Sequence, residues 1–157
     1  NDLFYGIFCN AGYGQLGAVE DLTRALIREQ FETNIFGHIE LINLFIPYMR
    51  KQNEGRIIFN SSVLGLVSFP FSSAYNATKF AMEAFARSLR LELKKTNIKV
   101  SLIEPGPIEA NFNINALKNL KRIKINNSVY KNKYYKMMKY LENGEDFFTL
   151  PASSVAE

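Results

Sequence analysis

The sequence predicts an α/β protein with a doubly wound parallel sheet, and two observations carry that prediction. Short apolar runs at residues 3–9, 56–60 and 98–103 alternate with helical patterns at 22–49 and 74–95. Polar residues follow each apolar run directly. Strands that alternate with helices form right-handed crossovers, which produce a parallel sheet. No apolar run approaches the roughly 18 residues that a membrane-spanning helix needs, so we expect no membrane span.

The first apolar run, Leu3 to Cys9, is continuous, which favours a strand buried on both faces of the sheet. It leads into a G-x-G-x-x-G pattern formed by Gly12, Gly14 and Gly17. Such a pattern binds a dinucleotide phosphate when an acidic residue ends a second strand about 20 residues later. The acidic side chains near that distance instead fall inside the next helical pattern, at Glu29, Glu32 and Glu40. We therefore predict that these glycines are not the phosphate loop.

The helical pattern from Leu22 to Met49 is interrupted near its middle. Asn34 and Gly37 are weak helix formers, and an asparagine inside a helix ordinarily faces solvent. His38 is the only histidine of the chain. One histidine cannot hold a metal alone and no cysteine or carboxylate cluster accompanies it, so we predict no metal site and assign His38 no chemistry.

The rest of the sheet is predicted from a strand at Arg56–Asn60, a helix from Ala74 to Lys95 and a strand at Ile98–Ile103. From residue 112 to 150 the sequence is basic, aromatic-rich and helical, without a strand pattern. We expect a lid or subdomain beside the sheet there. Residues 1–110 and 111–157 are therefore predicted to be two parts with different tasks.

Three polar side chains stand out around the second strand and the helix that follows it. Tyr75 and Lys79 are four residues apart, so a helix places them on one face. Ser62 lies just beyond the carboxyl end of the strand, where open α/β sheets bind their ligands. A phenol, an ammonium and a hydroxyl group are therefore expected to converge in one site. Ser61 is interpreted as an ordinary strand-end residue.

Together with these residues, further motifs resemble the short-chain dehydrogenase/reductase family in order and spacing. Asn10-Ala11-Gly12 is similar to the family's N-A-G turn after its fourth strand, and Asn34 to the asparagine of its catalytic tetrad. Ser62, Tyr75 and Lys79 match the other members of the tetrad, and Pro105-Gly106 the P-G turn after the sixth strand. The resemblance implies a Rossmann-type fold of which this chain holds strands four to six, followed by a truncated helical lid.

The resemblance also implies the functional residues and the cofactor, NAD or NADP. The catalytic residues would be Tyr75, Lys79, Ser62 and Asn34. The cofactor-binding residues would be Asn10, Ala11, Gly12, Tyr75, Lys79, Pro105, Gly106 and Ile108. Ala110 stands where the family often has a threonine that holds the nicotinamide. The family's phosphate loop would precede Asn1, and Pro151–Glu157 begins a helix that stops within a turn, so we expect a segment of a longer protein.

The proposed chemistry depends on the acidity of Tyr75. A tyrosine phenol has a pKa near 10. An ammonium about 4 Å away contributes roughly 4 kcal/mol at an effective dielectric of 20, or about three pKa units. This predicts a pKa for Tyr75 near 7, which suits a general acid/base. Ser62 would hold the substrate oxygen, and Asn34, by resemblance, would position a water that leads from Lys79 to solvent.

We therefore expect an NAD(P)-dependent oxidoreductase that interconverts an alcohol and a carbonyl on an apolar substrate such as a retinoid, steroid or long-chain aldehyde. Four aromatic or aliphatic residues flank the site as core or substrate wall: Phe69, Phe71, Ile108 and Phe112. Two alternatives stay open: a nucleotide-binding scaffold that has lost turnover, and an extended-type epimerase or dehydratase.

The remaining expectations concern nucleic-acid binding, cellular location and oligomeric state. The net charge of +4 is concentrated in residues 118–139, which is more typical of a solvated helix face than of nucleic-acid binding. The single cysteine favours a reducing compartment, so we expect a cytoplasmic protein. The helices at 22–49 and 74–95 carry more apolar residues than one sheet face needs. We therefore expect a homodimer or homotetramer that forms through them.

Overall fold

The computed structural model describes residues 4–108, 112–143 and 150–155. Its sheet contains β1 (Gly6–Cys9), β2 (Gly55–Asn60) and β3 (Ile98–Ile103) in the order β1-β2-β3. Both strand pairs are parallel, with Cys9 opposite Phe59 and Phe59 opposite Leu102. The predicted parallel sheet is confirmed. Its three carboxyl ends lie at one edge, as they must in a parallel arrangement.

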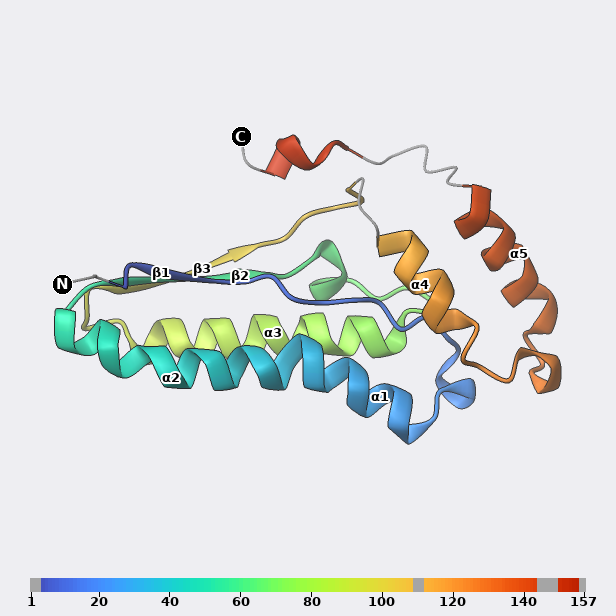
Figure 1. The fold of residues 1–157 in the computed structure, drawn as a ribbon, viewed down its shortest axis with the longest axis horizontal. Coiled ribbons are helices and arrows are strands. Elements are labelled where there is room, and N and C mark those ends of the chain that lie inside the picture. Colours follow the sequence, from blue (N-terminus) through green and yellow to red (C-terminus); the bar gives the residue numbers. More distant parts are fainter. Residues whose placement is uncertain (1–3, 109–111, 144–149, 156–157) are drawn as a thin grey trace.

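Helices α1 (Arg24–Phe31), α2 (Gly37–Gln52) and α3 (Ser73–Glu92) connect the strands. Helices α2 and α3 run along the same face of the sheet, whereas α1 lies further along, near the loop after β1 (Figure 1). The main apolar core forms between that face and the helices, and its fully buried members include Met49, Ile57, Phe59, Met82, Ala86 and Leu93. Short 3-10 turns lie at Val19–Asp21, Val63–Gly65, Ile125–Asn127 and Ala152–Val155.

The prediction that the first strand is buried on both faces is wrong for this structure. Side chains along β1 alternate between exposed and buried, and Phe8 is 54% exposed. The reason is that α2 and α3 both cover the opposite face, so every second side chain of β1 has no helix against it within the described residues. A continuous apolar run therefore does not reveal which face is covered.

A second, smaller apolar cluster joins the C-terminal helices to the loop after β1. Helices α4 (Phe112–Leu120) and α5 (Lys131–Asn143) lie beyond the carboxyl edge of the sheet (Figure 1). Their buried residues pack with the loop after β1 and with α1, in a group made of Ala18, Leu26, Leu120, Ile123 and Tyr134. We call this group the second cluster. The described part of 112–150 contains helical segments joined by turns, as predicted, and its one strand-like feature is an isolated bridge between Ile108 and Leu150.

Candidate active site

Hydrogen bonds fix the carboxyl ends of the strands relative to one another. The Asn60 side chain donates from Nδ2 to Oδ1 of Asn10 at 2.7 Å, which links the ends of β2 and β1. The amide of Ser61 donates to the carbonyl of Ile103 at 2.8 Å, which links β2 to β3. Ser62 then begins a tight turn, because its Oγ accepts from the amide of Leu64 at 3.1 Å. These hydrogen bonds fix the positions of the three strand ends relative to one another.

The side chain of Lys79 extends from α3 to the carboxyl end of β2. Its Nζ donates to the backbone carbonyl of Asn60 at 2.6 Å, and the residue is only 5% exposed. Burial lowers the pKa of Lys79 from 10.5 to about 8, because a charged ammonium loses water there. Tyr75 lies one turn earlier on α3, with Nζ of Lys79 5.5 Å from its ring centre. The structure thus brings Ser62, Tyr75 and Lys79 together, as the sequence predicted.

The predicted acidity of Tyr75 is wrong for the structure as it stands. Burial raises the pKa of the Tyr75 phenol above its usual value, and a hydrogen bond with Ser62 only partly opposes this. The expected lowering required the ammonium to lie about 4 Å from the phenol. Instead, Lys79 is directed to the carbonyl of Asn60. Desolvation of the phenolate is therefore the dominant effect on the pKa of Tyr75.

Asn34 lies inside a π-helical turn, Glu32–Phe36, which separates α1 from α2. The side chain is fully buried, so the general expectation of a solvent-facing asparagine is wrong, whereas the predicted interruption of the helix is confirmed. Its Nδ2 donates to Oγ1 of Thr78 at 3.1 Å and to the carbonyl of Tyr13 at 3.2 Å. Its Oδ1 accepts from the amide of Tyr13 at 3.2 Å. Asn34 therefore ties the loop after β1 to α3.

The glycine-rich loop after β1 uses its own amides within the protein. The amide of Gln15 donates to Oε1 of Gln30 at 2.6 Å, and that of Gly17 to the carbonyl of Phe71 at 2.7 Å. The amide of Tyr13 is taken by Asn34. Three of the amides that a phosphate loop would offer are therefore already paired. This agrees with the prediction that the glycine pattern is not the phosphate loop.

The remaining predicted cofactor residues border the same edge. The carbonyl of Pro105 accepts from the amide of Val63 at 3.1 Å. A side chain at Gly106 would meet no atom within 4 Å, so this turn faces open space. Ile108 forms its bridge with Leu150. Ala110, with its expected loss of a hydrogen bond, lies outside the described residues.

The flanking apolar residues separate into different roles. Phe112 packs edge-on against Tyr75, with ring centres 5.2 Å apart. Phe71 instead packs edge-on against Tyr130 and Tyr134, so it belongs to the second cluster. Phe69 is 58% exposed. Of these residues, Phe112 is the one in ring contact with the candidate catalytic tyrosine.

Several supporting residues were not found from the sequence. Gln30 is fully buried, and besides accepting from Gln15 it donates to the carbonyl of Tyr13 at 2.7 Å. Its spacing of four residues from Asn34, on the same helix face, was the available signal. Thr78 is also fully buried, and its hydroxyl donates to the carbonyl of Tyr75 at 2.8 Å while accepting from Asn34. Nothing in its local sequence distinguishes it from an ordinary helix residue.

Two kinds of site are not found in the described part of the chain. No group of three or more histidine, cysteine, aspartate or glutamate side chains is placed to hold a metal ion there. None of the described helices combines the length and the apolar character needed to cross a bilayer.

Comparison with known proteins gives consistent matches. A family model described as short chain dehydrogenase matches residues 5–121. The uncharacterized oxidoreductase YbbO of Escherichia coli (strain K12) is 47% identical over 115 residues, which cover 73% of this chain and 43% of YbbO. Retinol dehydrogenase 8 of Bos taurus is 43% identical over 103 residues, which cover 66% of this chain and 33% of that enzyme. The chain thus spans less than half the length of these relatives.

A solved structure gives the same fold over nearly the whole chain. A short-chain dehydrogenase/reductase from Burkholderia phymatum, in complex with NAD, matches with a TM-score of 0.80 and covers 97% of this chain and 55% of its own. At 24% identity this likeness shows the Rossmann-type α/β fold alone. The match to the family model and the 47% identity to YbbO show the family as well as the fold. The chain belongs to the short-chain dehydrogenase family.

Proposed function

We propose that the protein containing this chain is an NAD(P)-dependent oxidoreductase that interconverts an alcohol and a carbonyl. The observation that carries the proposal is the convergence of Ser62, Tyr75 and Lys79 at the carboxyl edge of a parallel sheet. Asn34, held in a π-helical turn against Thr78, supports the same constellation. In this proposal Tyr75 exchanges a proton with the substrate oxygen, and Ser62 orients that oxygen by a hydrogen bond.

The residues at this edge fit the nicotinamide and ribose end of NAD or NADP. A buried ammonium at Lys79 is a donor suited to ribose hydroxyl groups. The turn at Gly106, after β3, has open space around its Cα. The buried Oδ1 of Asn60 has no partner among the described residues, which leaves an acceptor for a bound group. When bound, the cofactor supplies the hydride chemistry and the protein supplies orientation and the proton.

The substrate we propose has an apolar body, such as a retinoid, a steroid or a long-chain aldehyde. Phe112 lies against the reactive phenol, so an apolar group next to the carbonyl would contact its ring. The part of the chain from residue 111 onward would then serve as the substrate-side part. One relative is a retinol dehydrogenase, which supports this class. Cys9 is a buried free thiol, which is compatible with the cytoplasmic location that we propose.

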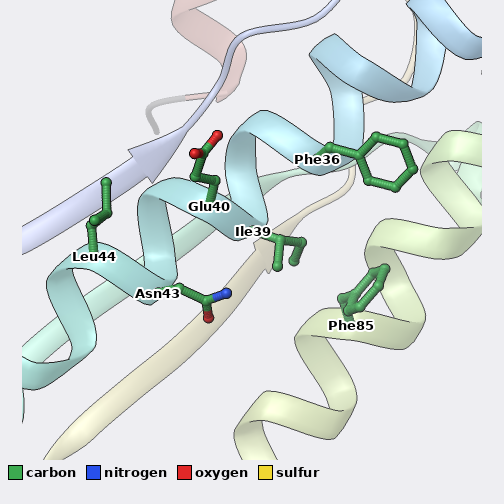
Figure 2. Close-up of a pocket in the computed structure, with 6 residues that line it drawn as sticks. All are labelled: Phe36, Ile39, Glu40, Asn43, Leu44 and Phe85. Atoms are coloured by element: carbon green, nitrogen blue, oxygen red, sulfur yellow. The ribbon is translucent and has the colours of Figure 1, made fainter.

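We further propose that two copies associate through α2 and α3. A hollow of about 440 Å³ lies between these helices, lined by Phe36, Ile39, Glu40, Asn43, Leu44 and Phe85. Figure 2 shows Phe36 at the end of the π-helical turn, Ile39 of α2 and Phe85 of α3 around it. Phe36 is 51% exposed and Leu44 is 62% exposed, which makes an apolar surface that a second copy would cover. Sedimentation of wild-type protein and of a Leu44→Glu variant tests this: the variant should be a monomer and wild type should not.

Steady-state oxidation of NADH and NADPH with a panel of aldehydes and ketones tests the proposed activity. We expect turnover with apolar carbonyl compounds in a protein that also carries the phosphate-binding half of the fold. Cofactor binding by calorimetry without turnover of any panel member would favour the scaffold that has lost activity. Epimerisation or dehydration of a nucleotide sugar, without net change in nicotinamide absorbance, would favour the extended-type alternative.

A further inference from the structure

Glu83 is a buried carboxylate on α3, one turn beyond Lys79. The residue is only 4% exposed. Its Oε2 accepts from Nη2 of Arg87 at 3.2 Å, and the Arg87 side chain lies largely in solvent. Its Oε1 is buried and has no hydrogen-bond partner in the described part of the chain. Because an ionised carboxylate only accepts hydrogen bonds, this second oxygen needs a donor from the interior.

Ser61 offers such a donor beside Gly65. The residue is buried, and its Oγ also has no partner among the described residues. A Cβ added at Gly65 would come 2.9 Å from Oγ of Ser61 and 3.1 Å from Cγ of Glu83. It would also come 3.1 Å from the backbone oxygen of Lys79. The hydroxyl and the acidic side chain therefore border the same point, and a serine hydroxyl can rotate to direct its hydrogen to an acceptor.

Gly65 ends the turn that begins at Ser62, so these groups lie against the segment that carries a candidate catalytic hydroxyl. The amide of Gly65 donates to the carbonyl of Ser62 at 2.8 Å, which closes the turn. Asn76 of α3 holds the turn further along, because its Nδ2 donates to the carbonyls of Leu64 and Val67 at 2.9 and 2.8 Å. A second attachment to α3 just before Ser62 would hold the turn at both ends.

We propose that Glu83 is a positioning residue for Ser62, acting through a hydrogen bond in which the Ser61 hydroxyl donates to the inner carboxylate oxygen. The inference rests on the proposed function, because it assigns Glu83 to the placement of the hydroxyl that orients the substrate oxygen. A hydrogen bond to a carboxylate is shorter and stronger than one between neutral groups. The contact therefore holds the start of the turn against α3, and Ser61 is more than an ordinary strand-end residue.

Substitutions on both sides of the proposed hydrogen bond form a double-mutant cycle. Glu83→Leu and Ser61→Ala each remove one partner, so we expect kcat to fall about tenfold in either variant, the equivalent of one hydrogen bond to a charged group. Cofactor affinity measured by calorimetry should not change. The double variant should lose no more than the more impaired single variant, because the hydrogen bond is already absent there. Losses that add in full would overturn the proposal.

Three further variants separate the inner oxygen from the charge and from the outer ion pair. Glu83→Gln keeps an acceptor oxygen and the shape of the side chain, so kcat should stay within about threefold of wild type. Glu92→Leu, which replaces an exposed glutamate on the same helix, is the matched control and should change neither value. Arg87→Gln leaves the carboxylate in place and should also keep kcat. A loss in Arg87→Gln as large as that in Glu83→Leu would assign the effect to the ion pair and overturn the proposal.

The pKa of Tyr75 gives a readout that does not depend on turnover. Burial raises this pKa, and a hydrogen bond with Ser62 opposes the rise. A displaced turn should weaken that hydrogen bond, so the pKa should rise further, by up to about one unit, in Ser61→Ala and in Glu83→Leu. NMR of protein labelled with ¹³C at the tyrosine ζ carbon measures this rise.

The two readouts distinguish failure of the proposed function from failure of this inference. If wild-type protein shows no turnover with any carbonyl compound, the proposed function fails, while the titration of Tyr75 still tests the placement of Ser62. Urea unfolding identifies any variant that does not fold, and Ser61→Ala removes a single oxygen atom. A pKa of Tyr75 that is unchanged in the folded variants would overturn the proposal.

Discussion

The two apolar clusters of this chain treat buried polar groups in opposite ways. Around the strand ends and α3, the structure leaves several buried side-chain atoms without partners among the described residues, on His38, Asn60, Ser61, Asn76 and Glu83. In the second cluster, the hydroxyl of Tyr134 donates to Oδ2 of Asp21 and accepts from the amide of Ala18, both at 2.7 Å. Oγ of Ser128 donates to the same carboxylate at 2.7 Å. Oε1 of Gln15, whose side-chain amide nitrogen donates to the carbonyl of Asn119 on α4, is also without a partner among the described residues. Most of the unpartnered buried atoms nevertheless lie in the first region, whereas the hydroxyl of Tyr134 is fully paired.

This difference indicates that the first region serves ligand binding or catalysis and the second cluster serves stability. Unpartnered buried groups are costly, and proteins retain them mainly where a ligand or a reaction needs them. A saturated network such as the one at Tyr134 contributes stability and fixes a surface. We therefore expect substitutions at the first region to change turnover with little loss of stability. Substitutions in the second cluster should do the reverse.

The largest expected effect is that of Tyr75→Phe. The change removes the phenolic proton and little volume, so turnover should fall roughly a hundredfold to ten-thousandfold, the range for a lost general acid/base. Cofactor affinity measured by calorimetry should change little. Turnover within tenfold of wild type would remove Tyr75 from the proposed mechanism.

Lys79→Met should abolish most turnover and still stabilise the fold. Burial lowers the pKa of Lys79 to about 8, so the folded state binds this proton less tightly than the unfolded state does. The resulting destabilisation is fully present below pH 8 and disappears as the pH rises to the unfolded value of 10.5. The Met variant should therefore gain about 3 kcal/mol at most near neutrality, and less at higher pH. Urea unfolding at several pH values measures this, and a gain that grows with pH would contradict it.

In the second cluster, Tyr134→Phe removes a fully buried hydroxyl with two hydrogen bonds. We expect the free energy of unfolding to fall by about 1–3 kcal/mol, because Asp21 and Ala18 lose a buried partner. Tyr135→Phe is the matched control: that side chain is 46% exposed and its hydroxyl contacts only Asn126 among the groups described. Its cost should stay within about 0.5 kcal/mol. Urea unfolding measures both variants. Equal losses in the free energy of unfolding would contradict the claim that the Tyr134 hydroxyl stabilises the fold.

The smallest expected effect lies where the two regions meet. A Cβ at Gly14 would come within 2.5 Å of Cζ of Phe112, so Gly14→Ala must displace that ring. Because Phe112 packs against Tyr75, the space for the substrate should narrow. We expect kcat/KM for bulky apolar aldehydes to fall less than about tenfold relative to short ones. Phe112→Leu should shift the same ratio in the opposite direction, and no change in either variant would show that Phe112 does not line the substrate.

The parallel sheet and the meeting of Ser62, Tyr75 and Lys79 were predictable, because strand patterns and an i, i+4 pair depend on local spacing. Other features depend on contacts far apart in the sequence. Asn34 is buried because it bonds to Tyr13 and Thr78, and no local pattern encodes those partners. The direction of Lys79 follows from the carbonyl of Asn60, 19 residues away. The predicted pKa of Tyr75 failed for that reason.

The most direct test of this account is the pKa of Tyr75 with and without cofactor, followed by NMR in protein labelled with ¹³C at the tyrosine ζ carbon. The Tyr75→Phe spectrum assigns the resonance. Without cofactor we predict a pKa above the ordinary tyrosine value, because burial dominates. With oxidised cofactor bound we predict a fall of several units towards neutrality, since additional positive charge then faces the phenol. A pKa that is the same in both states would contradict the claim that this site becomes an acid/base centre when the cofactor binds.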